Sequence, residues 1–257
     1  MAKIRTPSNN QIKEWRKLGM SKYRKKEGLF IAEGERCVEQ ILANGFVDVE
    51  SLVVDSGWEI PFSYPDESYE VDSEVFKSLS DTETPQGVLA VCNIPDQIAS
   101  IELLNQTGFL VASDAVQDPG NVGTIIRTAA WFGAAGLLIG NGTADPYHPK
   151  VVRSTAGATG ALPVIKGELS ELLDEFESEG WTTFLMDGSD GSVDVKTVTP
   201  GERSIIVIGN EGNGISDDLF SSDRTSVRIP GNDEAVESLN AAIALGVGMY
   251  ELRRGSY

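Results

Sequence analysis

The chain has 257 residues, of which 40% are apolar and 23% are charged, and its formal net charge is −18. A length above the ~100–200 residues of a typical domain predicts two domains or one large one, and this composition excludes a disordered chain. No apolar run approaches the ~18 residues of a membrane span, the N-terminus lacks the apolar core of a secretory signal, and neither Cys37 nor Cys92 stands in a CxxC pair. We therefore expect a reduced, cytoplasmic protein without disulfide bonds or zinc ribbons.

Residues 1–95 predict a small α/β unit. Ile12, Trp15 and Leu18 are spaced as in an amphipathic helix, whereas short apolar runs bounded by Gly or Pro are typical of strands. The expected elements are a helix over Asn9–Leu18, a strand at Leu29–Ile31, a helix over Glu33–Leu42, a strand over Val47–Val54, a short helix around Val75–Leu79 and a strand over Val88–Cys92. Asn44 and Gly45 are expected to end the second helix, because glycine readily adopts the left-handed conformation of a C-cap.

Basic side chains are concentrated at the N-terminus. Residues 1–36 hold ten of the 21 lysines and arginines but only four of the 39 acidic residues, so this segment is +6 within a chain of −18. The asymmetry predicts a local binding surface for a polyanion, with a solvated helix face as the plain alternative. The acidic remainder also suggests a salt-rich cytoplasm, in which surface carboxylates maintain solubility.

Residues 96–107 are predicted to form a linker with a short helical piece, and the pattern of apolar residues changes at residue 108. Continuous apolar strands then alternate with helices, as in a parallel sheet covered on both faces. We expect strands at Phe109–Ala115, Gly136–Ile139, Thr182–Met186, Ser204–Ile208 and Val227–Ile229, and helices over Val122–Phe132, Leu169–Glu179 and about Ser238–Arg253. Ligands of such sheets bind in loops beyond the carboxyl ends of the strands.

The first candidate loop is DPGNVGTIIR, residues 118–127. Pro119 and Gly120 predict a turn, and Asn121 is placed to cap the following helix, whose N-terminus favours anions. Arg127 is surrounded by mostly apolar residues, so we expect its stem to be buried and its charged head to reach an acceptor in a cleft. The alternative is that Asn121 is only a cap and Arg127 only extends to solvent.

Two further loops follow apolar strands. Residues 209–214, GNEGNG, hold three glycines that let backbone approach a ligand closely, and Glu211 supplies a carboxylate. This loop is neither a GxGxxG fingerprint nor a Walker loop with its lysine, which disfavours hydride transfer and ATP hydrolysis. In the last loop Ser238 can cap the terminal helix, and Asn240 can cap it instead or point at a ligand. A glycine-rich turn and a capped core helix are the plain alternatives.

Together and in this order, the stretches DPGNVGTIIRTAAWFGA, IVIGNEGNGIS and IPGNDEAVESLNAAIAL resemble the three motifs of the SpoU/TrmH class of RNA ribose 2′-O-methyltransferases, in the SPOUT superfamily. DPYHPKVVRSTAGATGALPV is similar to the region between the first two motifs, and FIAEGERCVEQIL is similar to part of the family's N-terminal domain. In this chain the polar residues 231–234 lengthen the third motif.

The resemblance implies a two-domain α/β protein. A small ribosomal-protein-like α/β domain that binds the RNA substrate would span residues 1–95, and a parallel-sheet SPOUT methyltransferase domain would span 108–257. The second domain would contain a deep trefoil knot, a rare exception to the rule that chains are not knotted. The resemblance also implies a homodimer with the knots at its interface.

The same resemblance implies the cofactor and the site residues. The backbone of Gly209, Ile229 and Leu239 would hold S-adenosylmethionine, and the catalytic and RNA-holding residues would be Asn121, Arg127, Glu211, Ser238 and Asn240. No metal is needed, because a sulfonium is already a good leaving group and the protein has only to align and deprotonate the attacking hydroxyl. The family proposal makes the arginine the base, but a guanidinium stays protonated; we therefore assign Arg127 to the RNA phosphate and the 2′-OH and leave proton removal open. The sole histidine, His148, lies outside all three loops.

The expected substrate is a structured RNA, ribosomal rather than transfer RNA, because small transfer-RNA members of the family often lack a separate N-terminal domain. The alternatives are a tRNA ribose methyltransferase and a non-catalytic RNA-binding or ribosome-associated scaffold. The presence of Asn121, Arg127, Glu211 and Asn240 favours an active enzyme over a scaffold. A generic nucleotide-binding protein would carry a phosphate-binding lysine or Rossmann glycines, and the sequence has neither.

Overall fold

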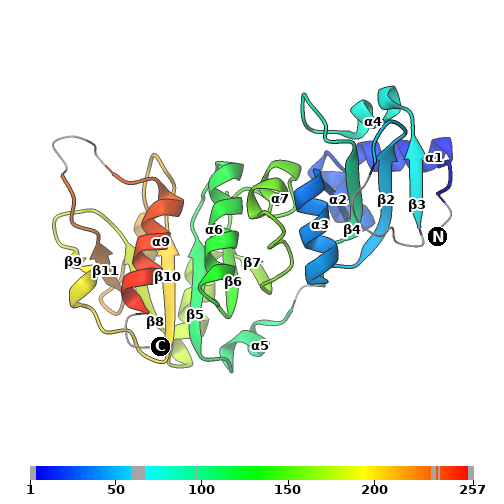
Figure 1. The fold of residues 1–257 in the computed structure, drawn as a ribbon. Coiled ribbons are helices and arrows are strands. Elements are labelled where there is room, and N and C mark those ends of the chain that lie inside the picture. Colours follow the sequence, from blue (N-terminus) through cyan, green and yellow to red (C-terminus); the bar gives the residue numbers. More distant parts are fainter. Residues whose placement is uncertain (1–3, 60–66, 97, 233–235, 237, 254–257) are drawn as a thin grey trace. The chain divides into compact units, whose positions relative to one another are not determined.

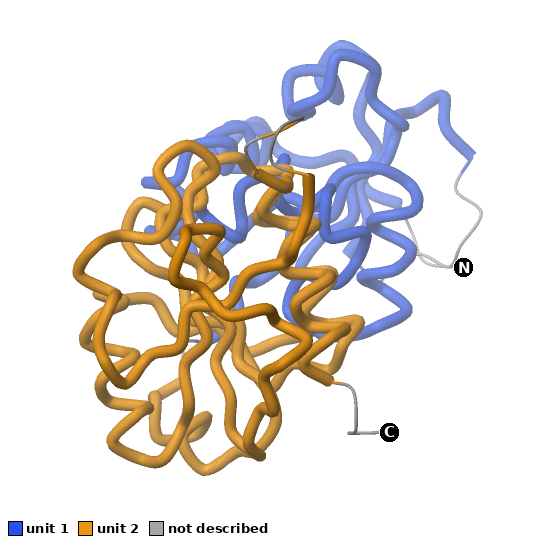
Figure 2. Tube along the Cα trace, turned by 90° about the vertical axis from the view of Figure 1, so that its left-hand side faces the viewer, with its two compact units in different colours: residues 1–96, 145–161 blue, residues 97–144, 162–257 orange. Residues whose placement is uncertain are grey.

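The computed structural model describes residues 4–59, 67–96, 98–232, 236 and 238–253. The chain forms two compact units: unit 1 comprises residues 1–96 and 145–161, and unit 2 comprises residues 97–144 and 162–257 (Figure 2). Unit 1 thus combines the N-terminal residues with the internal segment 145–161, which lies within the range 108–257 given above to the second domain. The short helix of the expected linker, α5 (Ser100–Leu104), buries Leu103 and Leu104 in unit 2.

Unit 1 is built on a mixed four-stranded sheet in the order β1-β4-β2-β3. Antiparallel pairs join β4 to β1 and β2, and β2 pairs in parallel with β3. Its elements are α1 (Asn9–Lys17), α2 (Ser21–Glu27), β1 (Leu29–Glu33), α3 (Glu35–Asn44), β2 (Val49–Asp55), β3 (Ser68–Val71), α4 (Ser73–Leu79), β4 (Val88–Asn93) and α7 (Pro149–Thr155). The expected elements are present within a few residues, and Gly45 ends α3 in the left-handed conformation as expected. Three elements, α2, β3 and α7, were not predicted from the sequence.

Alternating side chains of the unit 1 strands form two cores, one on each face of the sheet. Phe30 and Ala32 of β1 pack with Val38 and Ile41 of α3 and with Val152 of α7. On the opposite face, Ile31 and Leu89 pack with residues of α1 and α4, including Trp15 and Phe76. Helices therefore cover both faces of this small sheet, and α7 supplies part of one cover.

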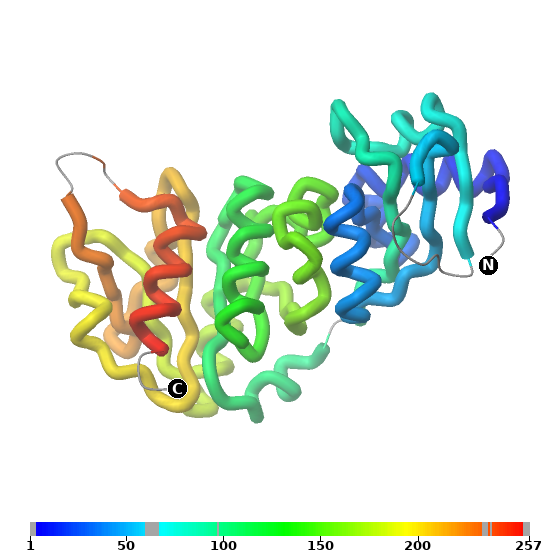
Figure 3. Tube along the Cα trace, viewed as in Figure 1, coloured from blue at the N-terminus to red at the C-terminus, as the bar shows by residue number. Residues whose placement is uncertain are grey.

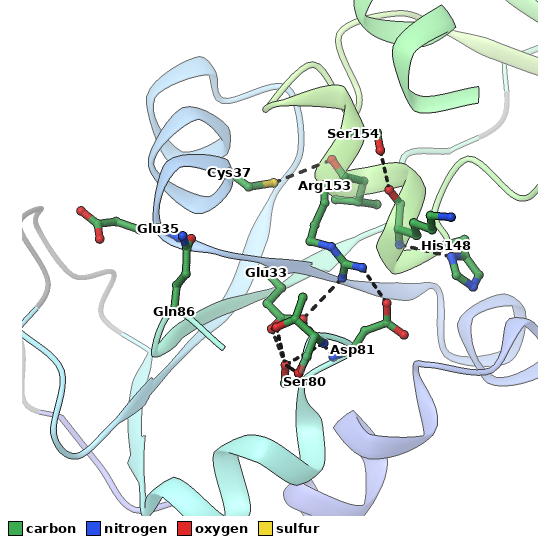
Figure 4. A network of polar contacts seen from close by, with 12 residues as sticks. Glu33, Glu35, Cys37, Ser80, Asp81, Gln86, His148, Arg153 and Ser154 are labelled. Atoms are coloured by element: carbon green, nitrogen blue, oxygen red, sulfur yellow. Dashed lines mark hydrogen bonds and ion pairs between the residues drawn. The ribbon is translucent and has the colours of Figure 1, made fainter. Parts of the chain in front are cut away.

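Segment 145–161 is held in unit 1 by paired charges. The Arg24 side chain is 1% exposed; its Nη2 pairs with Asp145 Oδ2 at 2.6 Å, and its Nη1 donates to the carbonyl oxygens of Leu18 and Gly19. The Arg153 guanidinium pairs with Asp81 at 2.8 Å and approaches the buried Glu33 carboxylate at 3.6 Å (Figure 4). Because Arg24 is enclosed in this way, it does not belong to the exposed basic surface that the N-terminal charge predicts.

Unit 2 is built on a seven-stranded sheet in the order β7-β6-β5-β10-β8-β11-β9, and every pairing in it is parallel, as expected (Figure 1). Its strands are β5 (Gly108–Ser113), β6 (Gly136–Gly140), β7 (Val164–Gly167), β8 (Thr182–Met186), β9 (Val193–Asp194), β10 (Arg203–Ile208) and β11 (Thr225–Arg228). Besides α5, its helices are α6 (Pro119–Trp131), α8 (Leu169–Ser178) and α9 (Ala241–Leu252), with 3-10 turns η1 (Val195–Thr197) and η2 (Asp217–Leu219). The strands β7 and β9 were not predicted from the sequence.

Helices cover both faces of the unit 2 sheet. On one face, Leu110, Leu185 and Ile205 pack with residues of α5 and α8 in a single apolar cluster. On the other face α6 and α9 lie side by side, and α9 contacts β8 and β10 (Figure 3). Small residues allow α9 to pack closely: a Cβ on Gly248 would lie 2.8 Å from the sulfur of Met186. Within the described residues, none of the helices combines the length and the apolar character needed to cross a bilayer.

Candidate active site

A cavity of about 960 Å³ opens at the carboxyl edge of the unit 2 sheet. Its walls are the loops that follow three neighbouring strands, β10, β8 and β11, together with the start of α9. The lining residues fall in the ranges 186–188, 208–212, 227–232 and 238–241, with Gly214, Val236 and Ala244. The cavity therefore lies where ligands bind in parallel α/β sheets.

The loop after β10 is a tight turn that brings backbone to the cavity wall. Asn210 and Gly214 exchange backbone hydrogen bonds of 2.8 and 3.0 Å, and the Asn210 side chain accepts from the amides of Gly212 and Asn213 while donating to the carbonyl of Ala115. A Cβ on Gly209 would lie 2.4 Å from backbone atoms of Gly214. No side chain fits there, so this turn requires glycine at position 209.

The start of α6 differs from the expected one. The helix begins at Pro119, and the side chain of Asp118, not that of Asn121, caps it by accepting from the Asn121 amide at 2.9 Å. The prediction that Asn121 is the cap was wrong because Pro119, which has no N–H to satisfy, fits the first helical position and moves the helix start three residues towards the N-terminus, from Val122 to Pro119. The Asn121 side chain is therefore free to reach across to other loops.

The start of α9 resolves the choice between Ser238 and Asn240 as its cap. Asn240 Oδ1 accepts from the amides of Ala242 and Ile243, at 3.1 and 3.2 Å. Its Oδ1 thus faces the helix, and its Nδ2 must face away from it. Ser238 lines the cavity instead.

Three side chains, from the first turn of α6, the loop after β10 and the N-cap of α9, form one directed hydrogen-bond chain. Asn240 Nδ2 donates to Asn121 Oδ1 at 2.9 Å, and Asn121 Nδ2 donates to Glu211 Oε1 at 2.7 Å. Because the α9 amides fix the Asn240 amide, each later amide has only one orientation that satisfies its partner. The chain ends on a carboxylate, and Glu211 Oε2 makes no hydrogen bond to any residue the structure describes. This oxygen remains available to a donor on a ligand.

Arg127 lies outside this group. Its side chain is exposed, it is absent from the cavity wall, and it forms no hydrogen bond or ion pair with the part of the chain that is described. The expectation of a buried stem in a cleft was wrong, because the apolar neighbours at positions 125, 126 and 129 point into the core while Arg127 projects from the opposite side of α6.

The remaining predicted site residues meet at the cavity. Gly209, Ile229 and Leu239, expected at the cofactor, all line it, as do Glu211, Ser238 and Asn240. Of the polar insertion, Gly231 and Asn232 line the cavity, whereas Asp233 and Glu234 lie outside the described residues. His148 caps α7 in unit 1, where its Nδ1 accepts from the Lys150 amide at 3.2 Å.

Sequence reasoning missed one wall of the cavity. Met186 ends β8, Asp187 and Gly188 follow it, and all three line the cavity, although they belong to none of the three motifs. An Asp-Gly pair directly after the apolar strand Thr182–Met186 was the signal that could have found them. Among the described residues there is no group of three or more His, Cys, Asp or Glu side chains suited to holding a metal ion.

Two family models match the chain. Residues 108–250 match the SpoU rRNA Methylase family, and residues 9–90 match the MRM3-like substrate binding domain.

Relatives match over nearly the whole length. The 23S rRNA (guanosine(2553)-2′-O)-methyltransferase RlmP of Bacillus subtilis is 34% identical over 98% of this chain and 100% of its own length. The AdoMet-bound rRNA methyltransferase of Sinorhizobium meliloti is 29% identical, with a TM-score of 0.83 over 98% of this chain and 97% of its own. The SpoU methyltransferase AviRb of Streptomyces viridochromogenes, solved in complex with AdoMet, is 26% identical, with a TM-score of 0.82 over 97% of this chain and 98% of its own.

Proposed function

Because this chain belongs to the SpoU rRNA Methylase family, we propose that it transfers a methyl group from S-adenosylmethionine to the 2′-oxygen of a ribose in ribosomal RNA. The observation that carries this proposal is the directed chain Asn240–Asn121–Glu211 beside a cavity of about 960 Å³. All three family motifs contribute one residue to that chain. Relatives named as rRNA 2′-O-methyltransferases favour ribosomal RNA over transfer RNA as the substrate.

The cavity fits S-adenosylmethionine. Its volume of about 960 Å³ lies at the upper end of the ~300–1,000 Å³ usual for small-molecule sites. Gly209 lets backbone approach a ligand where a side chain would not fit, while Ile229 and Leu239 supply apolar surface for an adenine. The bound cofactor supplies a methyl group on a sulfonium, which needs no further activation as an electrophile.

The residues of this chain then have to position the attacking hydroxyl. The N-terminus of α9 orients Asn240, Asn240 orients Asn121, and Asn121 holds one oxygen of Glu211. We assign to Glu211 Oε2 the acceptance of a hydrogen bond from the ribose 2′-OH, and to Ser238 a contact to the same ribose. A preset acceptor aligns the nucleophile at no cost in reorganisation during the reaction.

In this proposal Arg127 acts at the cavity of a second copy of the chain, because it lies outside the cavity of its own. It lies four residues before Trp131 and so shares its face of α6, and Trp131 is 84% exposed. On the neighbouring α9, Ile243 and Tyr250 are 55% and 62% exposed and share one face. Large exposed apolar side chains on adjacent helices mark an association surface, which supports a homodimer in which Arg127 binds RNA phosphate beside the partner's cavity.

We also propose three further properties on the basis of family membership. The chain around α9 would form the trefoil knot, unit 1 would bind the RNA, and the protein would act in the cytoplasm. The exposed lysines of α1 and α2 support RNA binding by unit 1, because phosphate contacts supply much of the affinity for nucleic acid.

The test is incubation of the purified protein with S-adenosylmethionine carrying a labelled methyl group and with RNA from cells that lack this enzyme. Label should enter large-subunit ribosomal RNA, and mapping should place it on a ribose 2′-oxygen. Glu211→Gln should lower incorporation strongly while the thermal midpoint stays near that of the parent protein. Label in transfer RNA would support the tRNA enzyme instead, and label in no RNA, despite cofactor binding, would support the scaffold.

A further inference from the structure

The loop after β8 places a carboxylate in the cavity that none of the three motifs contains. Asp187 is the first residue after β8, and β8 lies between β10 and β11, the strands whose loops form the other walls. Its backbone amide donates to the carbonyl of Val227 at 2.9 Å, which ties the start of this loop to β11. Asp187 therefore has a fixed position on the middle one of the three strand ends that wall the cavity.

The Asp187 side chain is also fixed in orientation. Oδ2 accepts from two hydroxyls, those of Ser189 and Ser192, the second at 3.1 Å, whereas Oδ1 accepts only from the Ser189 amide, at 3.3 Å. A carboxylate oxygen can accept two hydrogen bonds. Oδ1 thus keeps acceptor capacity in a half-buried residue of the cavity wall.

The position of Asp187 favours one part of the cofactor. Asn121 contacts Glu211 on the side of the cavity formed by the β10 loop, and Asp187 lies one strand further, at a strand spacing of about 4.8 Å. In S-adenosylmethionine the ribose is the next group after the sulfonium in the direction of the adenine. An acidic side chain beyond the carboxyl end of a strand is also the usual partner of a ribose hydroxyl in nucleotide sites.

We propose that Asp187 recognises the ribose diol of the methyl donor by accepting a hydrogen bond from it at Oδ1. This inference rests on the proposed function and adds to it a residue that selects an intact ribonucleoside. The competing role is structural: Asp187 would serve only to close loop 187–192 through Ser189 and Ser192.

Calorimetry with the reaction product S-adenosylhomocysteine and its 2′-deoxy and 3′-deoxy analogues separates the two roles. The parent protein should prefer the intact diol over at least one deoxy analogue by about tenfold or more, as expected for a hydrogen bond to a charged group. In Asp187→Ala this preference should disappear, because affinity for the diol falls to the level of the deoxy analogue. Asp190→Ala, which changes an exposed carboxylate of the same loop outside the cavity wall, should keep the parent preference.

Two further variants keep the test independent of folding. Asp187→Asn retains the shape and a neutral acceptor and should show a reduced preference, whereas Ser192→Ala removes a donor to Oδ2 only and should leave the preference intact. An equal loss for all ligands, or no loss, in Asp187→Ala would overturn the proposal. 5′-Methylthioadenosine lacks the amino-acid group but keeps the ribose diol. If Asp187→Ala weakens binding of S-adenosylhomocysteine but not of 5′-methylthioadenosine, Asp187 binds the ammonium group and the ribose assignment is wrong. Absence of binding by the parent protein would count against the proposed function itself.

Discussion

Asn121 shows how strongly one neighbouring residue determines what a side chain can do. Had the helix begun at Val122, as expected, Asn121 would spend its oxygen on a backbone amide. Because Asp118 and Pro119 start the helix earlier, the side-chain amide of Asn121 is free to join Asn240 to Glu211 by hydrogen bonds. The role of Asn121 thus depends on a cap, Asp118, that lies three residues before the predicted one.

Arg127→Ala should lower the rate of methyl transfer by about 100-fold or more, while the affinity for S-adenosylmethionine stays nearly unchanged. The reason is that Arg127 lies outside the cofactor cavity and carries a charge suited to RNA phosphate. Arg127→Lys keeps the charge but not the planar guanidinium and should recover part of the activity. Turnover by Arg127→Ala at the parent rate would show that the assignment is wrong.

Burial of Cys37 predicts a loss of stability at alkaline pH. Burial raises the pKa of the Cys37 thiol from 9.0 to about 11, so the folded state favours the protonated thiol. This contribution is complete below pH 9 and is lost as pH rises through 11, with a maximum of roughly 3 kcal/mol. Denaturant unfolding between pH 8 and 11 should show the decline.

Cys37→Val is the matched control for that experiment. Valine fills a similar buried volume without a titrating group, so the unfolding free energy should fall less steeply over the same pH range. Burial also raises the pKa of Tyr147 from 10.0 to about 12. The loss of stability due to Tyr147 therefore begins near pH 10, one unit above the onset for Cys37. Identical pH profiles for the two proteins would contradict the role given to Cys37.

At the scale of secondary structure, the turn between β10 and η2 is the most constrained element of the site. Gly209→Ala would place a Cβ 2.4 Å from the backbone of Gly214, so the turn has to open. We expect a loss of about 1–3 kcal/mol in unfolding free energy together with a loss of more than tenfold in cofactor affinity. Gly212→Ala, whose Cβ would meet the nearest atom at 3.5 Å, should keep the parent stability.

The sequence predicted the elements whose pattern is local and missed those that depend on distant contacts. The strands β5, β8 and β10 are continuous apolar runs and were predicted within two residues. By contrast, β7, β9 and α7 are short, and their sequences carry no periodic pattern; they exist because neighbouring strands and helices hold them.

The site divides in the same way. Glycine-rich turns after apolar strands identified the loops of Gly209 and Ile229, and six of the eight predicted residues line the cavity. The directions of the Asn121 and Asn240 side-chain amides could not be predicted, because each is set by a partner 90 or more residues away or by a helix start. The contribution of Asp187 was missed because its place follows from the strand order, which the sequence does not show.

For the molecule as a whole, the exposed face of α6 and α9 predicts association. Trp131→Glu should convert a dimer into monomers in analytical ultracentrifugation, because it places a charge on an apolar surface that the dimer would bury. Phe220→Glu, which changes a 41% exposed side chain outside both helices, should leave the mass unchanged. A parent protein that sediments as a monomer would contradict the proposed dimer.

The net charge of −18 predicts a dependence on salt. Repulsion between exposed carboxylates should be screened as the Debye length falls from about 10 Å at 0.1 M to about 3 Å at 1 M salt. The thermal midpoint should therefore rise with potassium chloride over this range, and an uncharged osmolyte of equal osmolarity provides the control. A midpoint indifferent to salt would remove the case for a salt-rich cytoplasm.

Segment 145–161 has a consequence for exchanging parts between relatives. A chimaera made with a single crossover near residue 96 would take residues 1–96 of unit 1 from one parent and residues 145–161 of the same unit from the other. Arg24 and Glu33, both almost fully buried, would then depend on whatever the second parent carries in place of Asp145 and Arg153. A mismatch would leave a buried charge without its counterion, at about 3–5 kcal/mol. Transplanting the N-terminal module therefore requires a second graft inside the catalytic half of the gene.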